Sequence, residues 1–229
     1  ARILAIERHP PFVARLRHRF AGQPNVRIVE ADLRDVPLPV RPFQVVASIP
    51  YSLSTTLLRR LLQPAVSGLQ AADLVVEWGF AKRLADPRAR DVESAWWGSR
   101  FECTVVRRIP RSAFAPAPAV DSAHLRIRHR PNMSGDLRTL RALHALLTAG
   151  YRGPGRPLRA VLAEVVPRSR AARISGVSGL APATSAGTLS VVEWAALARQ
   201  VGAGPASPLP RLPRRLDSGP SRRRGRTGG

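Results

Sequence analysis

The residues most able to do chemistry are Ser48-Ile49-Pro50-Tyr51, which directly follow the β-forming residues that begin at Val45. Pro50 has no N–H to donate to a β-ladder, and it favours an extended conformation at Ile49. We therefore expect a strand to stop here, with the carbonyl groups near Ser48 and Ile49 pointing out of the end of a sheet. Tyr51 would offer the flat face of its ring beside them. Carbonyl acceptors beside a stacking ring suit the binding of the amino group of a planar base.

Two carboxylates follow earlier strands, where they could take part in ligand binding. Residues 3–6 are expected to form a short strand that ends at Glu7, and residues 26–29 a second one that is followed by Asp32. In open parallel sheets, ligands bind at the carboxyl ends of the strands, and an acidic residue there commonly accepts hydrogen bonds from ribose hydroxyls. The alternative is that both acids are simply solvated strand ends. Their position ahead of residues 48–51 favours a joint site.

Residues 48–51 resemble the (N/D/S)-(I/P/L)-P-(Y/F) motif of S-adenosylmethionine-dependent methyltransferases that act on exocyclic amines. Four residues alone carry a high risk of a false match. With residues 114–122 (FAPAPAVDS), however, the chain is similar to the rRNA adenine N6-dimethyltransferases. Residues 74–83 (LVVEWGFAKR) and the basic tail look more like the Erm macrolide-resistance branch than the KsgA housekeeping branch. The resemblance runs from about residue 3 to about residue 198 and leaves out the tail.

On the cofactor side, this resemblance implies the Rossmann-like α/β fold of the class I methyltransferases, with S-adenosylmethionine as the cofactor. It implies that Glu7 holds the ribose of the cofactor. It also implies that Asp32 accepts a hydrogen bond from the adenine amine of the cofactor. The implied cofactor-binding residues are Glu7, Asp32 and Ser48.

On the target side, the resemblance implies that Ser48 and the Ile49 carbonyl hold the amino group of an adenine. Tyr51 would stack on the extruded base, and Phe114 would pack on its other side or edge. Members of the family more often have asparagine where Ser48 stands; a serine hydroxyl also accepts a hydrogen bond but reaches less far. Because the Ile49 carbonyl is unaffected, we expect the activity to be kept, while the number of methyl groups added stays open. The implied catalytic residues are Ser48, Ile49, Pro50, Tyr51 and Phe114.

The elements that must position these residues alternate between strand and helix. Strands expected at 43–49 and 72–77 enclose a helix expected at 55–62, which favours a parallel sheet covered by helices on both faces. Strands at 101–109 and 123–127 have no long helix between them and suggest an antiparallel hairpin at one edge. Helical spacing takes over after residue 131. We expect a methyltransferase domain over 1–130, a helical RNA-binding domain over 131–203 and a disordered Arg/Pro/Gly-rich tail over 204–229.

The chain begins at Ala1 inside the first expected strand, and no glycine-rich loop precedes Glu7. In the family that the chain resembles, such a loop lies just before this strand. Gly153 and Gly155 do not follow a strand and fail the structural context that a phosphate-binding loop requires. We therefore expect the first strand and the glycine loop to be missing from this sequence. A non-catalytic RNA-binding fragment is the corresponding alternative to an active enzyme.

Net charge is the strongest signal in the composition. The chain carries +22, from 37 basic and 15 acidic residues, and only one of the basic residues is a lysine. The planar fork of arginine suits phosphate groups, so a chain this positive is expected to bind nucleic acid. A solvated helix face is the alternative for each cluster. The candidate RNA-binding residues are Lys82, Arg83, Arg88, Arg90, Arg152, Arg156 and Arg159.

Several classes of protein are disfavoured by the composition. No apolar run approaches the ~20 residues that a membrane span needs, and the single Cys103 excludes a disulfide framework. The five histidines lack the spacing of metal ligands, and the four tryptophans are expected to pack rather than to stack on RNA. The resemblance to the Erm branch implies a cytoplasmic monomer that methylates 23S rRNA at an adenine N6 and confers resistance to macrolides, lincosamides and streptogramin B. A KsgA-type methyltransferase of 16S rRNA is the alternative enzyme.

Overall fold

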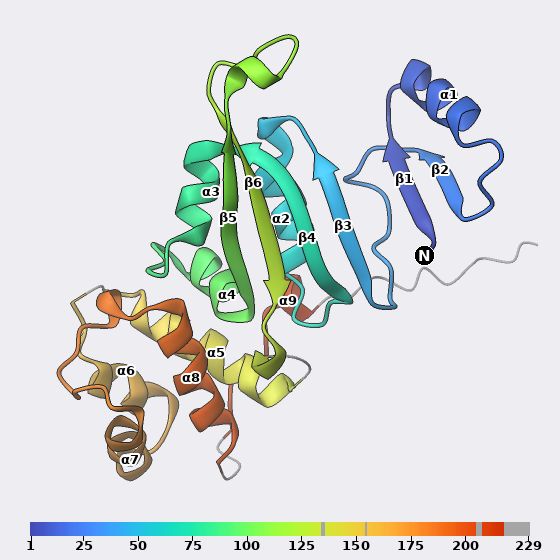
Figure 1. Cartoon of the computed structure of the whole chain (residues 1–229). Helices are drawn as coiled ribbons and strands as arrows, with labels where there is room; N and C mark the ends of the chain where they lie inside the picture. Colours follow the sequence, from blue (N-terminus) through green and yellow to red (C-terminus); the bar gives the residue numbers. More distant parts are fainter. Residues whose placement is uncertain (134–135, 154, 205–207, 218–229) are drawn as a thin grey trace, which may run out of the picture.

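A four-stranded sheet in the order β3-β4-β6-β5 lies at the centre of the computed structural model, which describes residues 1–133, 136–153, 155–204 and 208–217 (Figure 1). β3 (Phe43–Ser48) and β4 (Leu69–Glu77) are parallel. β6 (Ser122–His129) runs antiparallel to β4 and to the edge strand β5 (Phe101–Ile109). The sheet therefore has the parallel strands and the antiparallel hairpin that the sequence predicts, with β6 placed inside the edge strand.

A second, two-stranded parallel sheet lies beside β3. It consists of β1 (Ile3–Glu7) and β2 (Val26–Glu30), and α1 (Pro10–Arg19) packs against it (Figure 1). One continuous parallel sheet is expected from the sequence, but within the described residues β1 pairs with β2 and β3 pairs with β4. Apolar side chains near this interruption are exposed, Ile3 to 51% and Val46 to 85%.

Helices α2 (Ser54–Leu62), α3 (Trp78–Ala85) and α4 (Val92–Arg100) lie on one face of the central sheet (Figure 1). α4 is not expected from the sequence, although Asp91 and Ser94 form a capping box that marks its start. Buried leucines of α2 join the core with Leu74 and Val76 of β4.

The other face of the central sheet differs from the expectation of a sheet covered on both sides. It carries polar side chains that bond to one another: Asp73 Oδ1 lies 2.6 Å from His124 Nε2 and accepts from Arg126 Nε at 2.9 Å. Such charged side chains are stable where they keep contact with water or with each other, which is why this face needs no helix over it.

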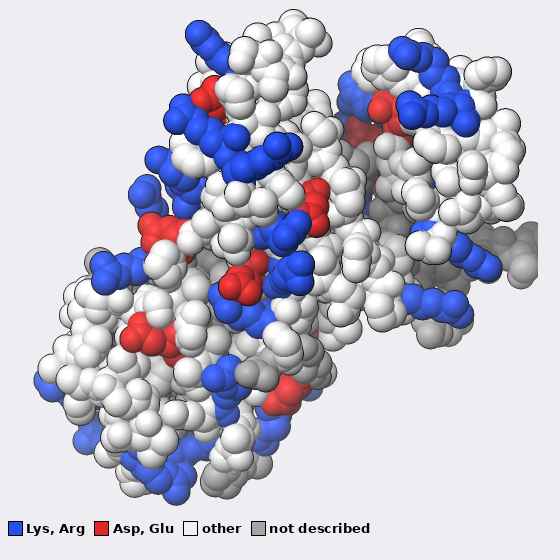
Figure 2. Space-filling view, in the orientation of Figure 1, with Lys and Arg blue, Asp and Glu red and all other residues white. Residues whose placement is uncertain are grey.

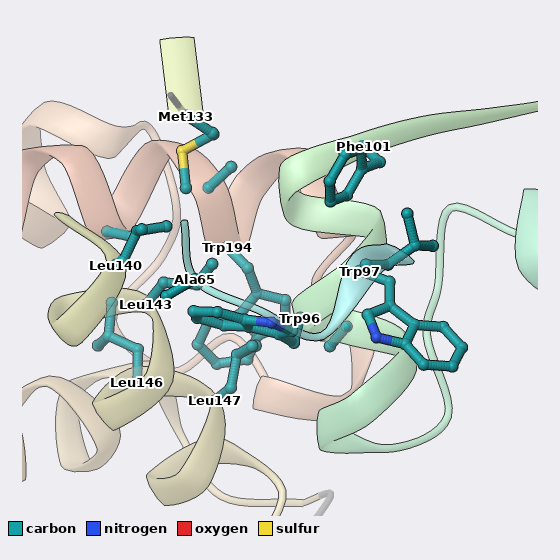
Figure 3. Close-up of a cluster of buried hydrophobic side chains, with 14 of the residues drawn as sticks. Ala65, Trp96, Trp97, Phe101, Met133, Leu140, Leu143, Leu146, Leu147 and Trp194 are labelled. Atoms are coloured by element: carbon teal, nitrogen blue, oxygen red, sulfur yellow. The ribbon is translucent and has the colours of Figure 1, made fainter. Parts of the chain in front are cut away.

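The second half of the described chain is helical. It contains α5 (Leu137–Gly150), α6 (Leu158–Val165), α7 (Arg168–Ser178) and α8 (Val191–Gly202). Figure 3 shows Trp96 of α4 between Trp194 of α8 and leucines of α5, and these side chains belong to the same hydrophobic cluster as the sheet. Trp96 and Trp97 are buried, at 1% and 4% exposed, so they pack as expected. No helix in the described ranges is long and apolar enough to cross a membrane.

Part of the tail departs from the disorder that its composition predicts. α9 (Arg214–Asp217) packs on the core through Leu212 and Leu216, which are 7% and 2% exposed. The Ala65 N–H donates to the Leu216 carbonyl at 2.7 Å. These two leucines, in a stretch rich in Pro and Arg, bury enough apolar area to hold the stretch against the core. Residues 205–207 and 218–229 lie outside the described ranges. The short 3-10 helices are η1 (Tyr51–Leu53), η2 (Arg111–Ala113), η3 (Pro131–Met133) and η4 (Ala186–Thr188).

Candidate functional site

The Ser48–Tyr51 motif stands where a strand gives way to a helix. The last ladder pair of β3 joins Ser48 to Val75, so Ile49 lies beyond the sheet. Pro50 has φ −54° and ψ 137°, and Tyr51 then opens η1, which leads into α2. Ser48 is exposed, while Ile49 and Tyr51 are half-buried. The strand therefore stops at the predicted place, and the Ile49 carbonyl follows the last residue that takes part in the ladder.

Tyr51 joins the two stretches that the sequence analysis singles out. Its hydroxyl lies 2.7 Å from Ser122 Oγ and donates to the Val120 carbonyl at 3.5 Å. The ring is thus fixed through its polar end, and the rest of the side chain stays half-buried at the end of the sheet. Phe114 is also half-buried and follows η2 in the loop between β5 and β6. Sequence reasoning assigned no role to Ser122, although it is the last residue of the stretch 114–122 and its hydroxyl bonds to Tyr51.

The loop that carries Phe114 is held by Asp121. Its Oδ1 accepts from the Arg111 N–H at 2.9 Å, and its Oδ2 accepts from Arg108 Nε at 2.7 Å. The hydrogen bond from the Arg111 N–H, and to a smaller extent that from Arg108, lowers the pKa of Asp121 below its ordinary value. The Asp121 carbonyl in turn accepts from the Trp78 N–H at 2.9 Å, at the start of α3. The end of β4, the loop and the Tyr51 ring are therefore connected by hydrogen bonds.

Glu7 and Asp32 lie at the carboxyl ends of the parallel strands β1 and β2. Figure 1 shows the arrowheads of β1 and β3 at the same edge, so the acids lie at the same edge as Ser48. Glu7 Oε1 accepts from the N–H groups of Arg8 and His9 at 2.8 Å each, which orients its carboxylate.

Asp32 has more partners than a solvated strand end would need. Arg34 donates to it through Nε at 2.9 Å and Nη2 at 2.7 Å, and Arg8 Nη1 lies 3.4 Å away. Hydrogen bonds from Arg34 hold the pKa of Asp32 well below its ordinary value, so this carboxyl stays ionised near neutral pH. The two acids offer carboxylate acceptors at neighbouring strand ends, and the hydroxyl and amine groups of a nucleoside donate to acceptors of this kind.

Comparison with known proteins shows which family the chain belongs to. Residues 2–201 match the family described as ribosomal RNA adenine dimethylase. The chain belongs to this family.

Individual members of the family fall on both sides of the Erm and KsgA distinction. The mycinamicin-resistance protein MyrB of Micromonospora griseorubida is 31% identical over 246 residues, which cover 99% of this chain and 77% of MyrB. The ribosomal RNA small subunit methyltransferase A of Synechococcus sp. (strain JA-3-3Ab) is 32% identical over 201 residues, covering 85% and 72%. The crystal structure of the 23S rRNA methyltransferase ErmE has a TM-score of 0.70 and 24% identity, covering 87% of this chain and 82% of that one. The fold is accordingly that of the class I S-adenosylmethionine-dependent methyltransferases.

Basic side chains of this rRNA adenine dimethylase family member gather over α3 and the β5–β6 hairpin (Figure 2). Lys82 Nζ lies 5.7 Å from the centre of the Trp78 ring, and the guanidinium carbon of Arg83 lies 5.8 Å from the centre of the Phe80 ring. Arg88 and Arg90 are exposed in the loop between α3 and α4. The structure thus brings Lys82 and Arg83 to the element that is hydrogen-bonded to Asp121.

The basic residues of the helical part have a different setting. Arg152 Nη1 donates to Glu164 at 3.0 Å, and Arg156 bonds to the same carboxylate and to the Ala149 carbonyl. Arg159 is exposed on α6. The Glu164 carboxylate offsets part of the charge of this group, so Arg159 has the least compensated charge of the three predicted residues.

Proposed function

We propose that this protein is an Erm-type 23S rRNA (adenine-N6)-methyltransferase that uses S-adenosylmethionine and confers resistance to macrolide, lincosamide and streptogramin B antibiotics. The observation that carries the proposal is the bond of the Tyr51 hydroxyl to Ser122, which brings both halves of the target motif to one strand end. The 31% identity to MyrB, over nearly the whole chain, favours the Erm branch.

In this proposal, the chain contributes positioning rather than proton transfer. The lone pair of an adenine amino group is delocalised into the ring, so acceptors that hold its hydrogens favour a nucleophilic, tetrahedral nitrogen. The Ile49 carbonyl and Ser48 are those acceptors, and the Tyr51 and Phe114 rings hold the base in line. Positioning of this kind lowers a barrier by up to about 7–11 kcal/mol in ideal cases. No side chain has to act as an early base.

The cofactor would be held by Glu7 and Asp32, with Ser48 at its reactive end. The orientation of the Glu7 carboxylate by two N–H groups and the ionised state of Asp32 fit this role. When bound, S-adenosylmethionine supplies a methyl group on a sulfonium. For Asp32 to accept a hydrogen bond from an adenine amine, Arg34 or Arg8 has to share the Asp32 carboxylate with that amine.

We also propose a further parallel strand between β1 and β3, with the glycine-rich loop that the family resemblance implies just before β1. The edges of β1 and β3 that face each other are unpaired within the described residues. One added strand would pair with both edges, make the sheet continuous and cover Val46, which is 85% exposed.

The RNA would be bound by Lys82, Arg83, Arg88 and Arg90 on the catalytic part of the chain, residues 1–130. The helical part, residues 131–203, would add Arg159 and, more weakly, Arg152 and Arg156. The protein would act as a monomer in the cytoplasm, where ribosomal RNA is found.

A KsgA-type methyltransferase of 16S rRNA is the second candidate. It is favoured by the 32% identity to a small-subunit methyltransferase. A family member that only binds RNA is a third candidate, and it requires that the cofactor site be incomplete.

One experiment separates the three. The natural full-length protein is incubated with S-adenosylmethionine labelled in its methyl group and with naked 23S or 16S rRNA. Label in adenine of 23S rRNA is the expected result. Label in 16S rRNA alone would overturn the Erm assignment, and binding of either RNA without any label would leave a binding protein.

A further inference from the structure

Trp78, the first residue of α3, lies against two cations that come from different elements. Lys82 Nζ, one turn further along α3, lies 5.7 Å from the centre of the indole ring. The Arg108 guanidinium carbon, on β5, lies 5.4 Å from the same centre. Cations over an aromatic ring are attracted by its negative face. We call these three residues the Trp78 platform.

Arg108 is held at this position although 60% of its side chain is exposed. Its Nε donates to Asp121 Oδ2 at 2.7 Å, while the indole ring contacts its guanidinium. An exposed arginine normally loses side-chain entropy when it binds a ligand, and contacts that already fix it reduce this cost. Arg111 is also exposed near Asp121, while Glu77, the residue before Trp78, pairs with Arg83. Two carboxylates, Asp121 and Glu77, therefore stand among four cations, Lys82, Arg83, Arg108 and Arg111, and the local charge stays positive.

The platform adjoins the candidate target site. The backbone N–H of Trp78 donates to the Asp121 carbonyl at 2.9 Å. The residues on either side of Asp121, Val120 and Ser122, bond to the Tyr51 hydroxyl. A strand of RNA that presents an extruded base to Tyr51 therefore has to pass over or beside this surface with its neighbouring phosphates.

We propose that the Trp78 platform binds a backbone phosphate of the RNA strand next to the target adenosine. This inference rests on the proposed function and adds Trp78 and Arg108, which sequence reasoning left out of the RNA-binding set. A phosphate suits this surface because two cations lie over the ring, and an anion is attracted to both. Asp121 binds Nε and Nη2 of Arg108, and the guanidinium has further N–H donors for a phosphate oxygen.

The test measures the affinity of the full-length protein for naked 23S rRNA over a series of salt concentrations, without cofactor. For Arg108→Gln we expect roughly fivefold weaker binding, and a salt slope of log affinity that is smaller by about 0.7–1, as for one lost phosphate contact. Trp78→Leu keeps both charges and should weaken binding, whereas Trp78→Phe should restore most of it. Arg41→Gln, at an exposed arginine that precedes β3 and so lies at the end of the sheet opposite to Ser48, is the matched control and should leave the slope unchanged.

A slope for Arg108→Gln that equals those of Arg41→Gln and the wild type would overturn the platform. The proposed function is judged separately, by whether the wild-type protein labels 23S rRNA. A protein that labels 23S rRNA but shows equal slopes is a methyltransferase whose phosphate contacts lie elsewhere. If the wild-type protein transfers no label to rRNA but Arg108→Gln lowers the salt slope of RNA binding, the phosphate contact at the platform is supported and the proposed methyltransferase activity is not.

Discussion

Tyr51 illustrates how a single residue can be fixed for binding without being buried. Its hydroxyl is bonded to Ser122 Oγ at 2.7 Å, while its ring remains half-buried at the end of β3. A ring held in this way loses little further freedom when a base stacks on it. The same bond explains why residues 48–51 and 114–122 belong together, although more than sixty residues separate them.

The stacking role of Tyr51 predicts a specific kinetic result. Base–aromatic stacking contributes about 1–3 kcal/mol, so Tyr51→Ala should reduce methyl transfer about 10- to 100-fold, with little change in cofactor affinity. Tyr51→Phe keeps the ring and loses the hydroxyl bonds to Ser122 and Val120, and should reduce methyl transfer roughly threefold to tenfold. Turnover with labelled cofactor and direct cofactor binding, measured for both variants, provide the check. Equal losses of turnover and cofactor affinity in Tyr51→Ala would argue against stacking.

Among the secondary-structure elements, α2 is the one that carries the end of the motif into the core, and its C-terminus is capped by a buried arginine of α4. Arg100 is 1% exposed and donates to the carbonyls of Leu62, Pro64 and Ala65 at 2.7–3.0 Å. Its guanidinium also lies 4.7 Å from the centre of the Trp96 ring. Burial lowers the pKa of Arg100 to about 9, which leaves it charged at neutral pH. A cation at the C-terminus of a helix is also favoured by the helix dipole.

Replacement of Arg100 by methionine should therefore destabilise the protein by about 2–3 kcal/mol, because buried carbonyls lose their donor. A matched control joins the same two helices: Arg59 of α2 forms an ion pair with Glu93 of α4 at 3.0 Å, with 60% of the Arg59 side chain exposed. Arg59→Met should cost no more than about 1 kcal/mol. Urea denaturation of both variants measures the difference, and equal losses would show that the Arg100 contacts do not cap α2.

The sequence predicts those elements whose signal is local. The alternation of apolar residues gives the strands, and Pro50 gives the end of β3. It does not predict α4, because Trp96, Trp97 and Gly98 are not a typical helix pattern. The docking of α9 depends on a contact between Leu216 and Ala65, two residues far apart in the chain. The same holds for the candidate site: the motif residues were found, but Ser122 and Asp121 act through contacts that only the fold creates.

On the scale of the whole molecule, the helical part and the sheet form one body. Trp96 of α4 and Trp194 of α8 lie in the same cluster as the leucines of the sheet-facing helix α2. The Tyr151 hydroxyl, at the end of α5, donates to the Ala89 carbonyl at 2.8 Å, in the loop that carries Arg88 and Arg90. The basic loop of the catalytic part is therefore held in position by the helical part.

Within the helical part, α5 and α8 approach each other closely at Gly150. A Cβ atom there would lie 2.6 Å from Cη2 of Trp194, whose ring is 0% exposed and has no room to move. Gly150→Ala should therefore destabilise the protein by about 1–3 kcal/mol through overpacking. Gly176 of α7 has no atom within 4 Å of such a Cβ, so Gly176→Ala should instead stabilise it by up to about 1 kcal/mol through helix propensity. Thermal and urea denaturation of the two variants should shift in opposite directions. A Gly150→Ala variant as stable as the wild type would mean that α5 and α8 do not pack at this distance.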